Sequence, residues 1–182
     1  MRPEVQRRDG MNTVTLLALL SLVFAGAMFG FFFAWVCSTM WGLDNTDPEV
    51  AVTAMQAMNA SVRNWVFAPT YFGTPALLIV TALAALRVRE RGAAFCFALA
   101  GVLYILGAML PTMTVNVPLN EALASVGTPL DAVQAREAWN DYSTPWQFWN
   151  TVRAVNSGMA LALAGWGLSR MNRTAPGNRA VH

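Results

Sequence analysis

Four polar side chains that can donate hydrogen bonds occur in two otherwise apolar stretches of the sequence. Asn116 and Asn120 are four residues apart in TVNVPLNEAL, and Asn150 and Arg153 are three apart in WNTVR. Each amide carries two N–H donors, and a guanidinium carries five. Donors held together away from water can stabilise an oxygen atom that becomes negatively charged during a reaction. The two stretches therefore predict a polar cluster that could form one wall of a binding site.

Each half of this predicted site allows a second interpretation. An arginine in the hydrocarbon of a membrane costs at least about 2.5 kcal/mol, so Arg153 either faces the protein interior with a partner or extends to the membrane surface. Pro118 has no N–H and disfavours helix at the preceding residue, which predicts a break between the two amides. Asn116 and Asn120 then either lie in water at the end of a helix or meet Asn150 and Arg153 across a bundle.

The elements that must position these residues are predicted from the hydropathy of the chain. Hydrophobic residues make up 55% of the 182 residues and charged residues 12%, against about 25% charged in soluble proteins. Four stretches have the roughly 20 apolar residues that a helix needs to cross a bilayer. They are 13–36, 65–86, 93–115 and 148–168. The sequence predicts an all-α integral membrane protein, an antiparallel four-helix transmembrane bundle over residues 13–169.

The placement of the arginines predicts the orientation in the plasma membrane. Arginines are concentrated in the tail 1–12, in the short connection 87–91 and in the tail 170–182, and such residues favour the cytoplasmic side. Both tails are therefore predicted to be cytoplasmic, and their composition indicates disorder. The net charge of +2, without a basic run interleaved with aromatic residues, argues against nucleic-acid binding.

The two longer loops are predicted on the outer side, and each should contain a helix. Residues 46–63 have a capping residue at Thr46 or Asp47 and apolar residues at helical spacing. This amphipathic helix either lies flat at the membrane surface or covers a pocket. A shorter helix is predicted at 129–140, ending before Pro145.

Two further pairs carry predictions about packing. Gly26 and Gly30 form a GxxxG pair, which favours close approach of a neighbouring helix. Cys37 and Cys96 are expected at opposite ends of the bundle, too far apart for the Cα separation of about 7 Å that a disulfide allows.

Five motifs in fixed order resemble the anthrone oxygenase-like family of small four-span membrane proteins. The motifs are GFFFAWVCSTMWGLD, AMQAMN, FGTP, TVNVPLNEAL and WQFWNTVRA. The resemblance runs from about residue 14 to 168 and implies a four-helix membrane fold. Some fungal members are associated with the oxidation of anthrones to anthraquinones. Several relatives have a histidine near the start of the last span, where this chain has Asn150 and Thr151.

The residue types limit the chemistry that is possible. The one histidine, His182, is the last residue, so we predict neither a metal site nor a cofactor. A cofactor-free monooxygenase acting on a flat aromatic polyketide or a quinone-like molecule fits the family. Its predicted catalytic residues are Arg153, Asn150 and Asp44, with Glu121 as a second candidate base. The predicted substrate-binding residues are Asn116, Asn120, Asn59, Tyr71, Trp146 and Trp149, and further aromatic walls are expected from Trp35, Trp41 and Trp65.

Two other functions remain open from the sequence. The first is a non-enzymatic membrane protein that binds a lipid or quinone or stabilises a partner. The second is metal handling by Met109, Met113, Cys37 and Met40, residue types that more often pack in a core. The expected surroundings are the lipid bilayer and an apolar small molecule; the oligomeric state is left open.

Overall fold

The computed structural model describes residues 3–173, and every regular element in that range is helical. The first helical segment runs from α1 (Pro3–Ala34) through the π-helical turn η1 (Trp35–Thr39) into α2 (Met40–Asp44). It is followed by α3 (Pro48–Ser61) and α4 (Phe67–Arg87).

The second half of the chain contains two more long segments. One runs from α5 (Arg91–Tyr104) through the π-helical turns η2 (Ile105–Met109) and η3 (Thr112–Asn116) into α6 (Val117–Ala124). The other is the single helix α7 (Ala132–Arg173).

Three of the helical segments are long and apolar enough to span a membrane: Asp9–Asp44, Phe67–Arg87 and Arg91–Ala124. The protein is therefore an all-helical integral membrane protein. The predicted fourth span, 148–168, lies in the second half of α7. Asn150, Arg153 and Asn156 lower the hydropathy of that part, and its membrane crossing stays a prediction.

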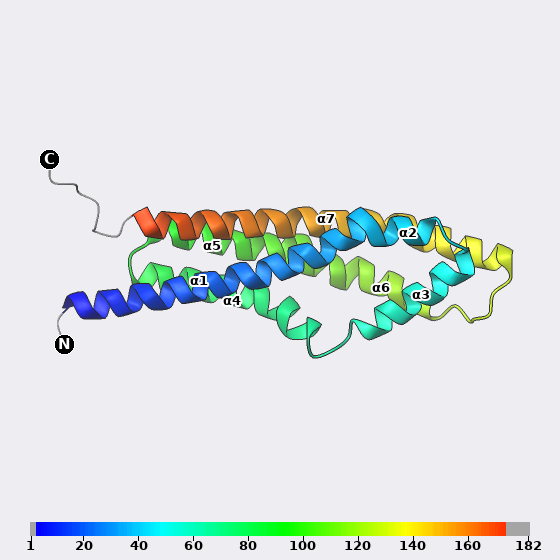
Figure 1. Ribbon diagram of the computed structural model, residues 1–182, viewed down its shortest axis with the longest axis horizontal. Helices are drawn as coiled ribbons and strands as arrows, with labels where there is room; N and C mark the ends of the chain where they lie inside the picture. The colour runs from blue at the N-terminus through cyan, green and yellow to red at the C-terminus, as the bar shows by residue number, and fades with distance from the viewer. Residues whose placement is uncertain (1–2, 174–182) are drawn as a thin grey trace.

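The long helices lie side by side, as Figure 1 shows. Helix α1 packs against α4 and α7, and α5 packs against the same two helices. Many of the fully buried core residues are alanines, and small residues let helix backbones approach closely. Examples are Ala18, Ala85, Ala100, Ala108 and Ala160.

The shorter helices gather at one end of the molecule, which we call the α3 end (Figure 1). Ala51, Val52 and Met55 of α3 are buried with Leu123 of α6 and Trp139 of α7. The predicted helix over 46–63 is thus confirmed, and Asp47 caps it by accepting the Glu49 N–H at 2.9 Å. Tyr142 and Trp146 of α7 and Met40 of α2 complete this second core.

Two predictions made from prolines are wrong. The short helix predicted at 129–140 does not end before Pro145, because α7 runs through this residue. The carbonyl of Asp141, which loses its intrahelical partner, belongs to an exposed residue and can face water. The break predicted near Pro118 is also missing, since helix continues through to Ala124. Pro118 lies in the first turn of α6, where its missing N–H costs little.

The π-helical turns explain how the chain passes Pro111 without breaking. Pro111 lies between η2 and η3. A wider π turn relieves the contact between a proline ring and the carbonyl four residues earlier. Gly107, inside η2, lies against α7: a Cβ there would be only 2.2 Å from the side chain of Asn156.

Three further predictions have mixed outcomes. The tail 1–12 was expected to be disordered, but α1 begins at Pro3. In the other tail, α7 extends to Arg173, and residues 174–182 lie outside the described range. Gly26 and Gly30 have no atom of a neighbouring element within 4 Å of an added Cβ, so they mark no close helix contact among the residues that the structure describes. Cys37 and Cys96 are free thiols.

Candidate functional site

Arg153 lies in the interior of the bundle. Its side chain is 5% exposed. Nη1 donates to Thr112 Oγ1 at 3.2 Å and Nη2 donates to Asn150 Oδ1 at 2.9 Å. The rings of Phe32 and Trp146 lie 4.8 and 5.2 Å from the guanidinium carbon. The structure thus selects the inward arginine over one that extends to the membrane surface.

The guanidinium is only partly satisfied by these contacts. Its Nε is buried and has no hydrogen-bond partner among the described residues. No Asp or Glu of residues 3–173 lies within ion-pair distance of it. A buried charge without a counter-charge is costly, and inside a membrane protein it marks a functional site by default.

Asn150 does not line the cavity and contacts the guanidinium from the protein interior. It is 1% exposed, and its Nδ2 donates to the carbonyl of Phe32 at 3.0 Å. Its oxygen is therefore fixed toward Arg153, one helical turn further along α7. The pair links α7 to α1 through the carbonyl of Phe32, and to η3 through Thr112.

The two amides that follow the third apolar stretch also point inward. Because the helix continues through Pro118, Asn116 and Asn120 share one face. Asn116 Nδ2 donates to the carbonyl of Trp146 at 3.2 Å, and Trp146 Nε1 donates to Asn120 Oδ1 at 2.9 Å. The amides therefore contact α7, and Trp146, rather than a direct hydrogen bond, connects them to Arg153.

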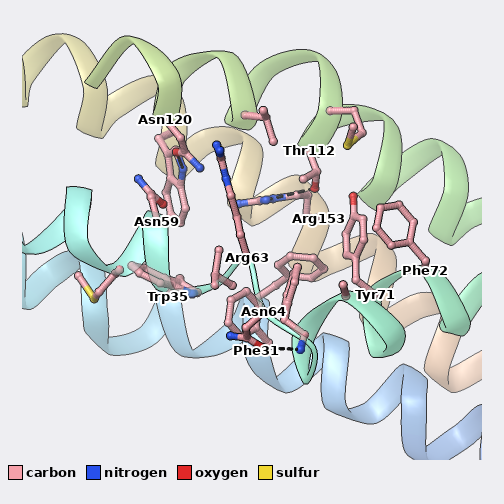
Figure 2. Close-up of a pocket in the computed structure, with 18 of the residues that line it drawn as sticks. Phe31, Trp35, Asn59, Arg63, Asn64, Tyr71, Phe72, Thr112, Asn120 and Arg153 are labelled. Atoms are coloured by element: carbon pink, nitrogen blue, oxygen red, sulfur yellow. Dashed lines mark hydrogen bonds between the residues drawn. The ribbon is translucent and has the colours of Figure 1, made fainter. Parts of the chain in front are cut away.

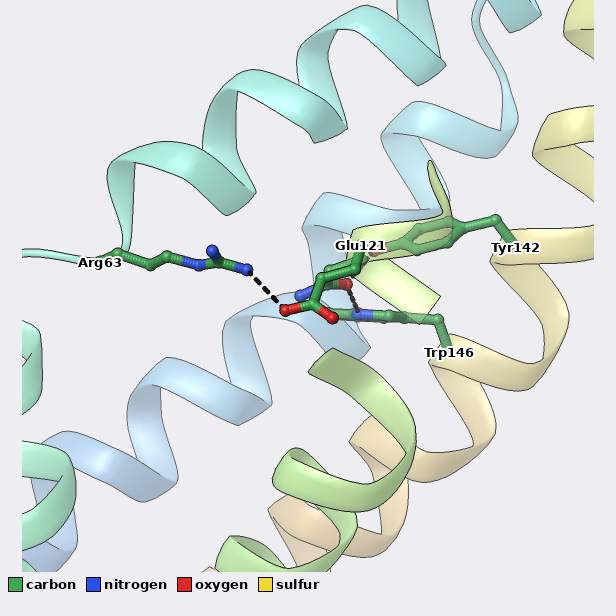
Figure 3. Close-up of polar contacts among 5 residues, drawn as sticks. Arg63, Glu121, Tyr142 and Trp146 are labelled. Carbon is green, nitrogen blue, oxygen red and sulfur yellow. Dashed lines mark hydrogen bonds and ion pairs between the residues drawn. The ribbon is translucent and has the colours of Figure 1, made fainter. Parts of the chain in front are cut away.

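A second hydrogen bond ties Asn120 to the α3 end through Tyr142, which Figure 3 labels. Tyr142 donates its hydroxyl to Asn120 Oδ1 at 2.7 Å and accepts a hydrogen bond from Asn59 Nδ2 at 3.2 Å. Burial raises the pKa of the Tyr142 phenol, so this hydroxyl remains a donor at neutral pH. Close by, Arg63 and Glu121 form an ion pair at 3.8 Å with both side chains more than 60% exposed.

Several of the side chains described above line a cavity of about 530 Å³ (Figure 2). Arg153, Thr112 and Asn120 supply its polar wall, while Arg63 and Asn64 lie where α3 connects to α4. The remaining lining residues are mostly aromatic or aliphatic: Phe31, Phe32, Trp35, Met58, Asn59, Val62, Trp65, Phe67, Ala68, Tyr71, Phe72, Met113, Val117 and Trp146. The volume and this lining suit a ligand of a few fused rings.

Aromatic rings form one side of the cavity. The centroids of Phe31 and Phe67 are 5.0 Å apart, and Phe67 stacks on Tyr71 at 5.3 Å. Trp35 contacts Trp146 at 5.2 Å. Such a surface binds flat, apolar molecules by stacking.

Helix α3 forms part of the cavity wall. Met58 and Asn59 line the cavity from the last turns of this helix, and Val62 and Arg63 follow directly after it. Of the two interpretations from the sequence, the geometry favours a helix that covers a pocket.

The predicted site residues divide into three groups. Those that line the cavity are Arg153, Asn120, Asn59, Tyr71, Trp146, Trp35 and Trp65. Asn150 and Asn116 lie behind this wall and contact it through Arg153 and Trp146. Asp44, Glu121, Trp41 and Trp149 do not line it.

Asp44 has a different task from the catalytic one predicted. Trp139 Nε1 and Ser143 Oγ donate to its Oδ1 at 2.9 and 2.7 Å, and Gln147 Nε2 donates to its Oδ2 at 2.8 Å. Both carboxylate oxygens are thus occupied by donors from α7. Asp44 fastens the end of α2 to α7 and does not reach the cavity.

The sequence analysis missed Thr112 and the phenylalanines of α1 and α4. Thr112 is four residues before Asn116, so the same helical spacing that linked the two amides would have included it. Phe31 and Phe32 belong to a run of three phenylalanines, which gives no signal for the face that each occupies. Within the described residues, no group of three or more His, Cys, Asp or Glu side chains could hold a metal ion.

Many of the site residues lie in the part of the chain that matches a known protein family. No curated protein and no solved structure matches the chain. A family model with the description "Anthrone oxygenase" matches residues 65–163, which is more than half of the chain. The matched range contains Tyr71, Thr112, Asn120 and Arg153 of the cavity wall. The chain belongs to the anthrone oxygenase family.

Proposed function

We propose that this protein is a monooxygenase that needs no cofactor and oxidises an anthrone, or a similar flat polyketide, in the aromatic cavity. The observation that carries the proposal is the buried guanidinium of Arg153, which has no counter-charge and lies in the wall of an apolar cavity. Such a group is suited to a ligand whose oxygen becomes an anion.

The proposed reaction supplies its own electrons. Loss of one proton from the CH₂ carbon of an anthrone gives an anion whose charge rests largely on the ketone oxygen. This anion transfers one electron to O₂, and the resulting radical pair combines to a hydroperoxide at the same carbon. Loss of the second C–H proton with cleavage of the O–O bond releases water. The sum is anthrone plus O₂ giving anthraquinone plus H₂O.

Arg153 stabilises the anion in this scheme. Two of its nitrogens already bond Thr112 and Asn150, which fixes the plane of the guanidinium. The free Nε–H and the remaining N–H groups are available to the ketone oxygen. The aromatic side chains, among them Phe67 and Tyr71, hold the ring system by stacking.

The proton goes to solvent in this proposal. None of the described side chains lining the cavity is an Asp, Glu or His. Stabilisation of the anion by Arg153 lowers the pKa of the bound anthrone, so hydroxide or water suffices as the base. The rate should therefore rise with pH without the falling limb that a second titrating group would cause.

The test is the oxidation of anthrone by the purified full-length protein in detergent. We expect formation of anthraquinone, with one O₂ consumed per product, well above the rate of autoxidation. Arg153→Met should lower the rate about 100-fold or more, the cost of losing one oxyanion donor. Arg136→Met is the matched control, because Arg136 is an exposed residue of the same helix outside the cavity. Autoxidation that wild-type protein does not accelerate would contradict the proposal.

The absence of an Asp, Glu or His side chain that could act as a base from the described cavity wall supports a second candidate function. In this alternative the cavity binds a quinone or a similar molecule without turning it over. Binding of anthraquinone should then raise the thermal unfolding temperature of the wild type but not of Arg153→Met, while anthrone oxidation stays at the autoxidation rate.

We further propose the arrangement of the protein in the membrane. The chain crosses the plasma membrane four times as an antiparallel bundle, with α7 as the fourth span, both termini cytoplasmic and the cavity facing outward. The arginines at the ends of α4, α5 and α7 support this orientation. A cysteine introduced at Ser125, in protein with Cys37→Ser and Cys96→Ser, should react with a membrane-impermeant thiol reagent in intact cells. Reaction only after cell lysis would reverse the orientation.

A further inference from the structure

A second hollow lies at the opposite end of the molecule from the α3 end. It measures about 440 Å³ and lies between the α4–α5 turn and the last turns of α7. Figure 1 shows this turn beside the C-terminal part of α7. The lining residues are Arg89, Glu90, Arg91, Gly92, Ala93, Trp166, Ser169 and Arg170.

Three guanidinium groups from separate parts of the fold converge on this hollow. Arg89 comes from the α4–α5 turn, Arg91 from the start of α5 and Arg170 from α7. Within the described residues, none of the three forms a side-chain hydrogen bond or ion pair. Glu90 also lines the hollow but has an interaction of its own. The hollow therefore carries an excess of positive charge whose donors remain available.

The backbone of the turn adds to this positive character. The N–H groups of the first turn of a helix have no intrahelical acceptor, and α5 begins at Arg91 without a side-chain cap. Arg170 lies over this turn: its Nε is 2.9 Å from the position that a Cβ of Gly92 would occupy. A glycine at 92 thus leaves room for the guanidinium beside the free N–H groups.

Arg89 occupies a position where a glycine would be more favourable. Its φ is 67°, in the left-handed region. The N–H of Arg89 bonds to the carbonyl of Leu86 at 3.0 Å, and the N–H of Glu90 bonds to that of Ala85 at 2.9 Å. This pair of bonds is the Schellman motif, which usually has glycine at the left-handed position. The fold alone therefore does not account for an arginine here.

The position of the hollow relative to the membrane indicates the kind of ligand. One candidate span ends at Arg87 and the next begins at Arg91, so the turn lies at the level where lipid phosphates are found. Trp166 lines the same hollow and is 56% exposed, and tryptophan is enriched at the membrane–water interface. We propose that this hollow binds a phosphate group, and that its source is the phosphodiester of an anionic phospholipid.

The test compares lipids and free phosphate on the purified full-length chain. Native mass spectrometry from detergent should show retention of phosphatidylglycerol well above phosphatidylcholine. Inorganic phosphate at a tenfold excess over the lipid should not displace it. Arg170→Gln and Arg89→Gly should each weaken retention about fivefold, as expected for one basic residue at an anionic membrane surface. Arg87→Gln is the matched control, because Arg87 is exposed at the same end but does not line the hollow; it should stay within about twofold of wild type.

The variant Arg89→Gly separates a loss of binding from a loss of folding. Glycine adopts the left-handed conformation without strain, so its thermal unfolding temperature in lipid-free detergent should equal or exceed that of wild type. Three outcomes would overturn the proposal: equal retention of the two lipids, equal weakening by Arg87→Gln, or displacement by inorganic phosphate. The last outcome would identify a site for free phosphate instead of lipid.

Discussion

Two charged side chains lie at neighbouring levels of α7, and their surroundings differ: Asp44 of α2 contacts this helix, and Arg153 belongs to it. The carboxylate of Asp44 accepts hydrogen bonds on both oxygens from three α7 side chains. The guanidinium of Arg153 is buried, uses two of its nitrogens and leaves Nε without a partner. Asp44 lies away from the cavity, whereas Arg153 lines it. The comparison teaches that a charge satisfied by the protein holds the fold together, and that one left incomplete beside a cavity is available to a ligand.

The same comparison explains why only one of these two predicted catalytic residues lines the cavity. A carboxylate near an apolar span could act as a base, but the oxygens of Asp44 are already used as acceptors. Trp139 and Ser143 are buried and need these oxygens. A buried donor without its acceptor costs about 1–3 kcal/mol.

The largest expected effect comes from Arg153→Met, with activity and stability measured together. Anthrone oxidation should fall about 100-fold or more. The free energy of unfolding should change little, because removal of a buried charge without a counter-charge offsets the cost of leaving the Asn150 oxygen without its donor. Steady-state kinetics and chemical unfolding in detergent check the two expectations. A large loss of stability would make Arg153 a structural residue like Asp44.

Asp44→Ala should give the opposite result. Trp139 and Ser143 lose their acceptor, so the free energy of unfolding should fall by about 2 kcal/mol. The rate of oxidation per folded molecule should be unchanged, because Asp44 does not line the cavity. Asp131→Ala is a suitable control, since that carboxylate caps the exposed start of α7 and should cost only about 1 kcal/mol. A rate that falls with Asp44→Ala in parallel with that of Arg153→Met would restore Asp44 as the base.

Asn120→Ala should have an intermediate effect, since Asn120 belongs to both the cavity wall and the hydrogen-bonded core. Its oxygen accepts from Tyr142 and Trp146. Loss of this acceptor should lower the free energy of unfolding by about 1.5 kcal/mol and raise KM for anthrone several-fold. The same assay and unfolding measurement apply. An unchanged KM would place Asn120 with the structural residues.

The sequence was sufficient for the apolar spans, for the helix over 46–63 and for most of the polar residues of the site, but not for Thr112. Periodicity and hydropathy depend on local sequence, so α3 and the apolar spans could be predicted. The effects of Pro118 and Pro145 could not, because Pro118 falls in the first turn of α6 and the carbonyl freed by Pro145 belongs to an exposed residue. The partners of Asp44 could not be predicted either, since they are about a hundred residues away along the chain.

The smallest expected effect tests how Arg153 is held. Thr112→Val removes the acceptor of Arg153 Nη1 at nearly constant side-chain volume. One hydrogen bond to a charged group is worth about 1.5 kcal/mol at the lower end of its range, so kcat/KM for anthrone should fall about tenfold. Stability should change little, because the guanidinium keeps its bond to Asn150.

Thr114→Val is the matched control for this last variant. Thr114 is exposed, does not line the cavity, and its hydroxyl bonds to the carbonyl of Leu110 on its own helix. It tests the same substitution two residues away without touching Arg153. If the two valine variants lower kcat/KM equally, the loss comes from the π-helical segment and not from the guanidinium. If only Thr112→Val does, the orientation of Arg153, and not its charge alone, determines how well the cavity stabilises an anion.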